Sequence, residues 1–295
     1  MVKDLKEFKK ICIYSSLEAN KVKHISNQLE EILHNLELEI LIPKSFKSYQ
    51  TNFGKYFTDE YISKNADLII AIGGDGTLLS SARKFGYTGI PVLGVNLGSL
   101  GFLTDVPPEE LTTSIQKILL GKYEKEQRFF LDSQINEEIV KNRALNEIVI
   151  HSKKVAQLIE YELFIDESFV YRQKADGIIV STPTGSTAYS LSAGGPIIHP
   201  ATEAICLLPM FPHSLNSRAL IVNESAKIKI RLCEKGNASL SLDSHLNFPL
   251  KKGDIVSISK SASPLTLIHP LGHDFYSSSR NKLGWSLGVP AKKKI

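Results

Sequence analysis

A nearly continuous apolar run enters a glycine-rich segment at Asp67-Leu68-Ile69-Ile70-Ala71-Ile72-Gly73-Gly74-Asp75-Gly76-Thr77, and the class of the first domain follows from this junction. An apolar run of this kind is typical of a strand buried on both faces of a parallel sheet. A helix is predicted to follow from Thr77 to Phe85. Because glycines let the backbone turn sharply, the segment indicates the strand–loop–helix unit of an α/β domain.

Further strands and helices alternate on both sides of this unit. Short apolar runs at 11–14, 38–42 and 90–95 predict strands. Apolar residues recur at helical spacing over 19–36, which predicts a helix. Such alternation implies right-handed crossovers over a doubly wound parallel sheet.

The later part of the chain has a different pattern. Charged and apolar residues alternate from Lys227 to Leu232, as in a strand with one face in solvent. The same period of two returns at 238–242 and 254–259. We therefore predict a mostly antiparallel β domain over roughly 130–261, with a charged link before it near 120–127.

These patterns divide the chain into three parts. We expect an α/β domain over residues 1–125 and a β domain over 126–265. The remaining segment, 266–295, contains a predicted short helix at 275–287 and is expected to pack back on the first domain.

Composition excludes several classes of function. The chain has 295 residues, 42% of them hydrophobic, and a net charge of +4 that is too small to argue for nucleic-acid binding. Its three cysteines are far apart and form no CxxC pair, which argues against a disulfide framework or a zinc site and for a reducing compartment. The sequence shows no signal peptide and no apolar run of membrane-spanning length. We expect a cytoplasmic protein with neither a nucleic-acid nor a membrane partner.

The eight histidines offer no metal geometry in the sequence. His269 and His273 are four residues apart, but Pro270 and Gly272 argue against a helix that would place both on one face. No residue is therefore assigned as a metal ligand.

The glycine loop after the apolar strand is the first candidate for chemistry. Backbone N–H groups at the start of a helix form an anion site. Asp75 would repel a phosphate there, so its presence is explained if it acts as a base or holds a cation that bridges phosphates. The alternative is a tight turn in which Asp75 only caps the helix. The absence of a GxxxxGK[ST] pattern excludes a P-loop enzyme.

A segment crowded with hydroxyls and small residues, Asp176 to Pro196, is the second candidate. Small residues permit close approach of a ligand, hydroxyls and N–H groups can donate to phosphate and sugar, and Tyr189 could stack on a base. The alternative is a solvated turn. The segment lacks the GxSxG nucleophile pattern, so it does not indicate a hydrolase.

Two shorter motifs complete the set. Asn146-Glu147 lies inside an apolar run, and an amide beside a carboxylate suits adenine and ribose recognition. An edge pair in solvent is an equally good explanation. The loop from Asn96 to Thr104 contains two glycines three apart and is interpreted as a structural loop.

Together these motifs resemble the NAD kinase family. The glycine loop alone also resembles the loop of phosphofructokinases and of lipid kinases, whereas the run from Asp176 to Pro200 is much more specific. The loop at Asn96, the Asn146-Glu147 pair and the segment from Pro212 to Arg218 match in order and spacing, so the resemblance covers roughly the whole chain.

The resemblance implies a Rossmann-like N-terminal domain and a β-sandwich C-terminal domain, with the end of the chain returning to the first. It implies that Asp75 is the general base and that the loop around it meets the phosphates. Asn146 and Glu147 would contact the ribose and adenine, and Lys174 and Asp176 the nicotinamide half. The implied substrate- and nucleotide-binding residues are Gly73, Gly74, Gly76, Thr77, Asn146, Glu147, Lys174, Asp176, Thr187, Ala188, Tyr189, Ser190, Leu191, Ser192 and His245.

One departure from the family pattern concerns Asp243-Ser244-His245, where Asp-Gly-Gln is common. If this position touches the ligand, His245 makes the contact more pH-dependent than an amide would.

The implied reaction is transfer of the γ-phosphoryl group of ATP to the 2′-hydroxyl of the adenosine ribose of NAD, which gives NADP. Mg²⁺ would accompany the triphosphate. The resemblance also implies a homo-oligomer, either a dimer or a tetramer. The apolar stretch from Ala204 to Pro212 is hard to bury inside one sandwich and suits a subunit contact. A loop that covers the core is the alternative explanation of this stretch. The competing functions are a diacylglycerol-type lipid kinase and a non-catalytic dinucleotide sensor.

Overall fold

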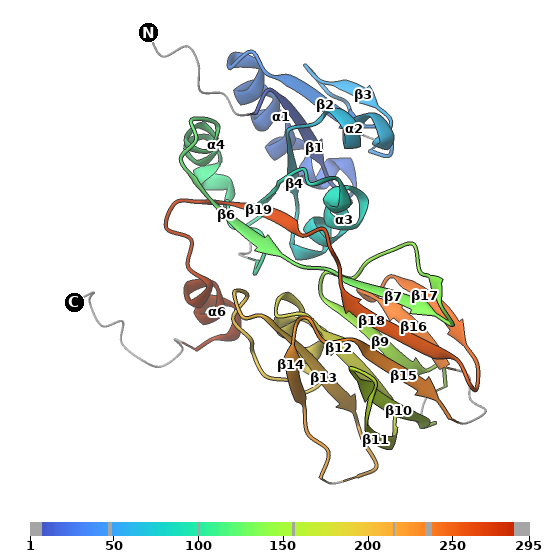
Figure 1. Ribbon diagram of the computed structural model, residues 1–295. Helices are drawn as coiled ribbons and strands as arrows, with labels where there is room; N and C mark the ends of the chain where they lie inside the picture. The colour runs from blue at the N-terminus through green and yellow to red at the C-terminus, as the bar shows by residue number, and fades with distance from the viewer. Residues whose placement is uncertain are drawn as a thin grey trace. The chain divides into compact units, whose positions relative to one another are not determined.

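The computed structural model describes residues 8–46, 49–98, 101–154, 157–214, 216–233 and 238–285. The chain forms two compact units, one made of residues 1–127 with 265–295 and the other of residues 128–264. Each unit is built around its own sheet structure (Figure 1).

The first unit is an α/β domain around a seven-stranded sheet in the order β3-β2-β1-β4-β5-β19-β6. Its strands are β1 (Lys10–Tyr14), β2 (Glu39–Pro43), β3 (Lys55–Phe57), β4 (Leu68–Ile72), β5 (Val92–Val95), β6 (Tyr123–Arg128) and β19 (Leu265–Pro270). The pairs from β3 to β19 along this order are parallel. The order 3-2-1-4-5 is that of a Rossmann-like sheet, as the resemblance implied.

The helices of this unit are α1 (Ala19–Asn35), α2 (Asp59–Asn65), α3 (Asp75–Phe85), α4 (Leu111–Leu119) and α6 (Phe275–Leu283), with short 3-10 turns η1 (Gly86–Thr88) and η2 (Pro108–Glu110). The apolar stripe predicted for the first helix is buried: Val22, Leu29 and Leu33 are fully enclosed in the same core as Ile115 of α4. β4 is buried along its whole length, as its apolar sequence predicts.

The end of the chain belongs to the first unit. β19 is inserted between β5 and β6 and pairs in parallel with β5, so the predicted return of the C-terminal segment is confirmed (Figure 1). The helix predicted at 275–287 ends at Leu283, because Gly284 follows in the left-handed conformation that closes a helix. Residues 286–287 of that prediction lie outside the described residues.

The second unit is a β-sandwich of two six-stranded sheets. One has the order β11-β10-β15-β18-β7-β8 and the other β14-β13-β12-β9-β16-β17. The strands are β7 (Leu131–Ile135), β8 (Glu138–Ile139), β9 (Glu147–Ser152), β10 (Ile159–Ile165), β11 (Ser168–Ala175), β12 (Gly177–Ser181), β13 (Ala204–Met210), β14 (Leu220–Asn223), β15 (Ile228–Leu232), β16 (Ala238–Leu242), β17 (Leu246–Leu250) and β18 (Ile255–Lys260).

Both sheets contribute to one core. Ile228 and Ile230 of β15, which alternate with charged residues, pack in the same cluster as Ile148 of β9 and Val180 of β12. The predicted antiparallel character is confirmed, since every strand pair described in this unit is antiparallel.

One expectation about the second unit is wrong. The apolar stretch from Ala204 to Pro212 is expected to be hard to bury inside one sandwich, yet its first part, β13, is a completely buried strand between β12 and β14. Pro209 is accommodated because β14 begins at Leu220, opposite Leu207, so Pro209 has a strand partner on the β12 side only. Phe211, directly after the strand, is 76% exposed.

Candidate active site

The glycine loop turns from β4 into α3. Gly73 has a φ of +153°, and a Cβ there would lie 2.3 Å from Thr77 Oγ1, so only glycine fits. The cap residue of α3 is Gly74, and the helix begins at Asp75, two residues earlier than predicted. The alternative in which Asp75 caps the helix is therefore wrong. A Cβ at Gly74 or Gly76 would meet no described atom within 4 Å, which leaves room for a ligand against the first helical turn.

The carboxylate of Asp75 is held by the neighbouring loop after β5. Its Oδ2 accepts a hydrogen bond from the Phe102 N–H at 2.9 Å, and its Oδ1 accepts one from the Leu103 N–H at 3.0 Å. The loop from Asn96 to Thr104, whose residues 99–100 lie outside the described residues, therefore does more than connect two elements. It fixes the one carboxylate of the glycine loop.

In the second unit, Asn146 and Glu147 stand at the start of β9 and are 8% and 2% exposed, so the edge pair in solvent is excluded. The hydroxyl-rich segment packs on them. Thr182 donates its N–H to the Asn146 carbonyl at 2.9 Å, and a Cβ at Gly185 would lie 2.1 Å from that same oxygen. The fold thus brings two separate motifs of the sequence together.

Asp243 lies against Asn146 and Glu147 and forms with them a buried corner of the sandwich. The sequence alone assigns Asp243 no role. Its carboxylate accepts hydrogen bonds from the N–H groups of Leu145 at 3.0 Å, Asn146 at 2.8 Å and Glu147 at 3.2 Å. Asp243 and Ser244 both have left-handed backbone conformations, with φ of +45° and +58°. The unusual Ser244 therefore occupies a position that favours glycine.

Burial dominates the electrostatics of Glu147. Desolvation, followed by the nearby charge of Asp243, raises the pKa of Glu147 from 4.5 to about 8. A carboxyl that stays protonated at neutral pH can donate a hydrogen bond as well as accept one.

The segment after β12 is compact rather than solvated. It forms a 3-10 turn, η3 (Thr184–Thr187), and a short helix, α5 (Tyr189–Ser192). Ser186 and Ser190 are fully buried, and the Ser186 hydroxyl donates to the Pro183 carbonyl at 2.6 Å. Tyr189 is 41% exposed, which leaves its ring accessible to a ligand.

The predicted residues fall into separate groups. Asp75 and the residues of its loop lie in the first unit, and all the others lie in the second. His245 is exposed on the turn between β16 and β17. Lys174 lies on β11, one residue before the end of that strand, and Asp176 follows it, with its N–H donating to the Met210 carbonyl at 3.0 Å.

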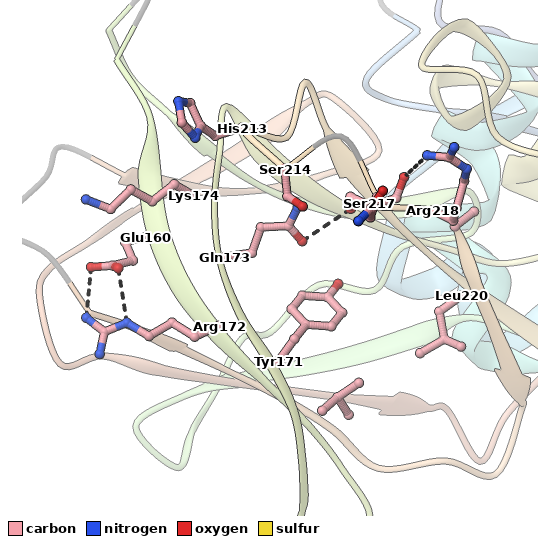
Figure 2. Close-up of a pocket in the computed structure, with 13 residues that line it drawn as sticks. Glu160, Tyr171, Arg172, Gln173, Lys174, His213, Ser214, Ser217, Arg218 and Leu220 are labelled. Carbon is pink, nitrogen blue, oxygen red and sulfur yellow. Dashed lines mark hydrogen bonds and ion pairs between the residues drawn. The ribbon is translucent and has the colours of Figure 1, made fainter.

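Lys174 lines a cavity of about 690 Å³ on the sandwich (Figure 2). The cavity is bounded by β11 and by the segment that precedes β14, and the His213 N–H donates to the Lys174 carbonyl at 2.9 Å. Arg172 and Glu160 form a double ion pair at its rim, with N–O distances of 3.0 and 2.9 Å. The remaining lining residues are Val170, Tyr171, Gln173, Ser214, Asn216, Ser217, Arg218, Ala219 and Leu220.

A histidine cluster in the first unit corrects another expectation. A turn after β19 brings His269 and His273 together with Asp105, so that one ligand atom from each lies within 4.8 Å of the others. The sequence-based conclusion that the histidines offer no metal geometry is therefore wrong for this pair. We interpret the cluster as an ion-pair network, because both Nδ1 atoms face the same Oδ2 of Asp105, and His269 Nε2 lies 3.1 Å from Glu126 Oε2.

The glycine loop fits one class of protein. Helix N–H groups that can hold phosphates, with a fixed carboxylate among them, suit a nucleotide-dependent phosphotransferase. Known family models agree: residues 10–123 match the ATP-NAD kinase N-terminal domain, and residues 145–270 match the ATP-NAD kinase C-terminal domain. The chain belongs to the NAD kinase family, as its motifs suggested, and it is a kinase that uses ATP to phosphorylate NAD to NADP. The lipid-kinase and sensor alternatives are not supported.

Individual relatives match over nearly the full length. The chain is 41% identical to an NAD kinase of Teredinibacter turnerae over 288 residues, which cover 96% of this chain and 98% of that protein. Among solved structures it resembles yeast NADH kinase complexed with NADH, with a TM-score of 0.82, 27% identity and coverage of 97% and 90%. It also resembles an NAD kinase from Archaeoglobus fulgidus in complex with ATP, with a TM-score of 0.73, 28% identity and coverage of 93% and 97%. No helix among the described residues is long and apolar enough to cross a membrane.

Proposed function

We propose that this chain transfers the γ-phosphoryl group of ATP to the 2′-hydroxyl of the adenosine ribose of NAD, with Asp75 as the general base. The observation that carries the proposal is the position of the Asp75 carboxylate at the start of α3, fixed by the backbone N–H groups of Phe102 and Leu103. A sugar hydroxyl is a weak nucleophile, and removal of its proton by a positioned carboxylate contributes roughly 10² to 10⁴ in rate.

The glycine loop would hold the phosphates. The first N–H groups of a helix generally lack partners within it, although the Thr77 N–H of α3 donates to the Gly74 carbonyl at 2.9 Å. The positive end of the helix dipole also favours negative charge. Gly74 and Gly76 leave this turn open, and Gly73 permits the sharp exit from β4. Charge neutralisation and positioning supply most of the catalysis in phosphoryl transfer.

The buried corner of the sandwich would recognise the dinucleotide. Asn146 can pair with the donor and acceptor edge of adenine, and a protonated Glu147 can donate to a ribose or ring acceptor. Tyr189 offers an accessible ring for stacking. Lys174 and Asp176 are proposed for the nicotinamide half, and Thr187, Ala188, Ser190, Leu191, Ser192 and His245 remain candidate contacts.

A divalent cation, most suitably Mg²⁺, is part of this proposal. Mg²⁺ usually keeps several waters and binds substrate phosphates, so the triphosphate itself would supply its ligands while Asp75 serves as the base. Bound with the triphosphate, the cation would neutralise charge on the transferred group.

We further propose a homo-oligomer. Phe211 is 76% exposed, Phe169 58% and Ile221 51%. Large exposed apolar side chains mark interaction surfaces, and aromatic ones such as the two phenylalanines are enriched at subunit contacts. The cytoplasmic location expected from the sequence stays a prediction.

The test is NADP formation by the purified protein supplied with NAD, ATP and Mg²⁺. Asp75→Asn should lower kcat by about 10² to 10⁴ with little change in the KM for NAD. Asp67→Asn is the matched control, because Asp67 also accepts two backbone N–H bonds, from Lys9 and Lys10, in the same unit. Excess EDTA should abolish turnover, and Mg²⁺ should restore it. Near-normal kcat in Asp75→Asn would refute the assignment of the base.

A further inference from the structure

The loop between β5 and η2 closes on itself. Asn96 is 1% exposed, and its side-chain oxygen accepts the Gly98 N–H at 2.9 Å while its amide donates to the Thr104 carbonyl at 3.4 Å. The Gly101 N–H donates to that same carbonyl at 3.3 Å. Because its two ends are tied in this way, the described part of the loop presents a defined backbone surface toward Asp75.

That surface binds the Asp75 carboxylate through two backbone N–H groups, which together are called the carboxylate seat. The N–H groups of Phe102 and Leu103 each hold one of its oxygens, at 2.9 and 3.0 Å. Two donors on two oxygens fix the plane of the carboxylate, and charge-assisted bonds of this type are stronger than neutral ones. The rotation of the Asp75 side chain is thus set by a loop 27 residues further along the chain.

Gly101 makes the close approach possible. A Cβ at this position would lie 2.1 Å from Asp75 Oδ1 and 2.3 Å from Thr104 Oγ1, both far inside contact distance. Gly101 itself is buried and Thr104 is fully enclosed, so an alanine side chain at position 101 would have to displace the ends of the Asp75 and Thr104 side chains. Of these two displacements, that of the Asp75 carboxylate moves the proposed base.

We propose that Gly101 is a positioning residue for phosphoryl transfer: its missing side chain lets the N–H groups of Phe102 and Leu103 seat the Asp75 carboxylate. The inference rests on the proposed role of Asp75 as the base. The loop from Asn96 to Thr104 would thus affect the rate of phosphoryl transfer although it does not supply the reacting group.

The test compares Gly101→Ala with the wild-type enzyme in steady-state kinetics. A displacement of about 1 Å at a reacting group can cost about 10²-fold in rate, so kcat should fall by about that factor. The KM for NAD should stay within about twofold, because the seat acts on the base and not on substrate binding. Gly89→Ala is the control: Gly89 has a φ of +78° and open space around it, so alanine there adds backbone strain without touching Asp75.

A double-mutant cycle separates positioning from general damage. In an Asp75→Asn background, Gly101→Ala should cause no further loss of kcat, since the group on which it acts is already gone. An additive loss would show a merely structural effect and overturn the inference. If Gly101→Ala alone does not fold, Gly101→Ala with Thr104→Ala removes the second collision and keeps only the one with Asp75.

The outcomes also separate this inference from the proposed function. Full activity in Asp75→Asn would refute the role of Asp75. An inactive Asp75→Asn beside a Gly101→Ala or Gly101→Ala/Thr104→Ala variant with wild-type kcat would refute the positioning role of Gly101 alone.

Discussion

Replacing Glu147 by Gln should remove a large part of the pH dependence of the stability of the sandwich. Glu147 is 2% exposed, and burial followed by the charge of Asp243 raises its pKa from 4.5 to about 8. A group whose pKa is higher in the folded state stabilises the fold fully below its unfolded pKa. That contribution is lost as the pH rises through the folded pKa. Gln mimics the protonated side chain at every pH.

The size of the effect follows from the two pKa values. For a carboxyl that titrates at 4.5 when unfolded and at about 8 when folded, linkage gives a loss of roughly 3 to 4 kcal/mol in unfolding free energy between about pH 5 and about pH 8. Glu147→Gln should therefore be close to the wild type in stability near pH 5 and more stable by about that amount near pH 8.

The assay is urea unfolding at a series of pH values, followed by far-UV circular dichroism. Because two units can unfold in separate transitions, hydrogen exchange in β9 identifies the transition of the sandwich. Glu138→Gln is the control, since Glu138 is an exposed carboxylate of the same unit. Parallel stability curves for Glu147→Gln and the wild type from pH 5 to pH 8 would refute the reasoning.

Three further predictions concern other parts of the chain. Ser244→Gly should raise the unfolding free energy by about 0.5 to 1 kcal/mol, because Ser244 has a φ of +58°; an unchanged or lower Tm would contradict this. Burial lowers the pKa of His269, but its bonds to Asp105 and Glu126 outweigh this and raise it to about 9. The stabilisation of the fold by the protonated His269 is therefore complete below the unfolded pKa of 6.5 and is lost as the pH rises through the folded pKa of about 9. His269→Gln should accordingly lower Tm near neutral pH and have a smaller effect above pH 9, and an equal deficit at both would count against the ion-pair network. Phe211→Glu should weaken self-association, measured by sedimentation at micromolar protein with and without NAD; an unchanged association state would exclude this contact.

The sequence alone was sufficient where the signal is local. The apolar run from Leu68 to Ile72 predicted a strand buried on both faces, because every residue of such a strand is apolar whichever strands flank it. The alternation from Ile228 to Leu232 predicted a strand buried on one face, because successive side chains of a strand point to opposite faces. The glycines at 73, 74 and 76 marked the turn, although α3 begins two residues before its predicted start because Gly74 caps it.

Local patterns failed where burial depends on distant partners. The composition of the stretch from Ala204 to Pro212 suggests that it is hard to enclose, because the sequence does not show that β12 and β14 flank its first seven residues, the strand β13. The sequence argues only against a helix that would place His269 and His273 on one face, whereas in the structure a turn brings the two side chains together. Their partner Asp105 lies 164 residues from His269.

The sequence by itself determined the two kinds of domain, the family and the residues whose chemistry fits phosphoryl transfer. Only the tertiary structure showed what holds those residues. Asp243 reaches the N–H of Asn146 across 97 residues, and Leu103 reaches Asp75 across 28. Each contact depends on which strands become neighbours, β16 beside β9 and β5 beside β4. Side-chain periodicity fixes which face of a strand is buried, but the strand's neighbours are set by packing of the whole chain.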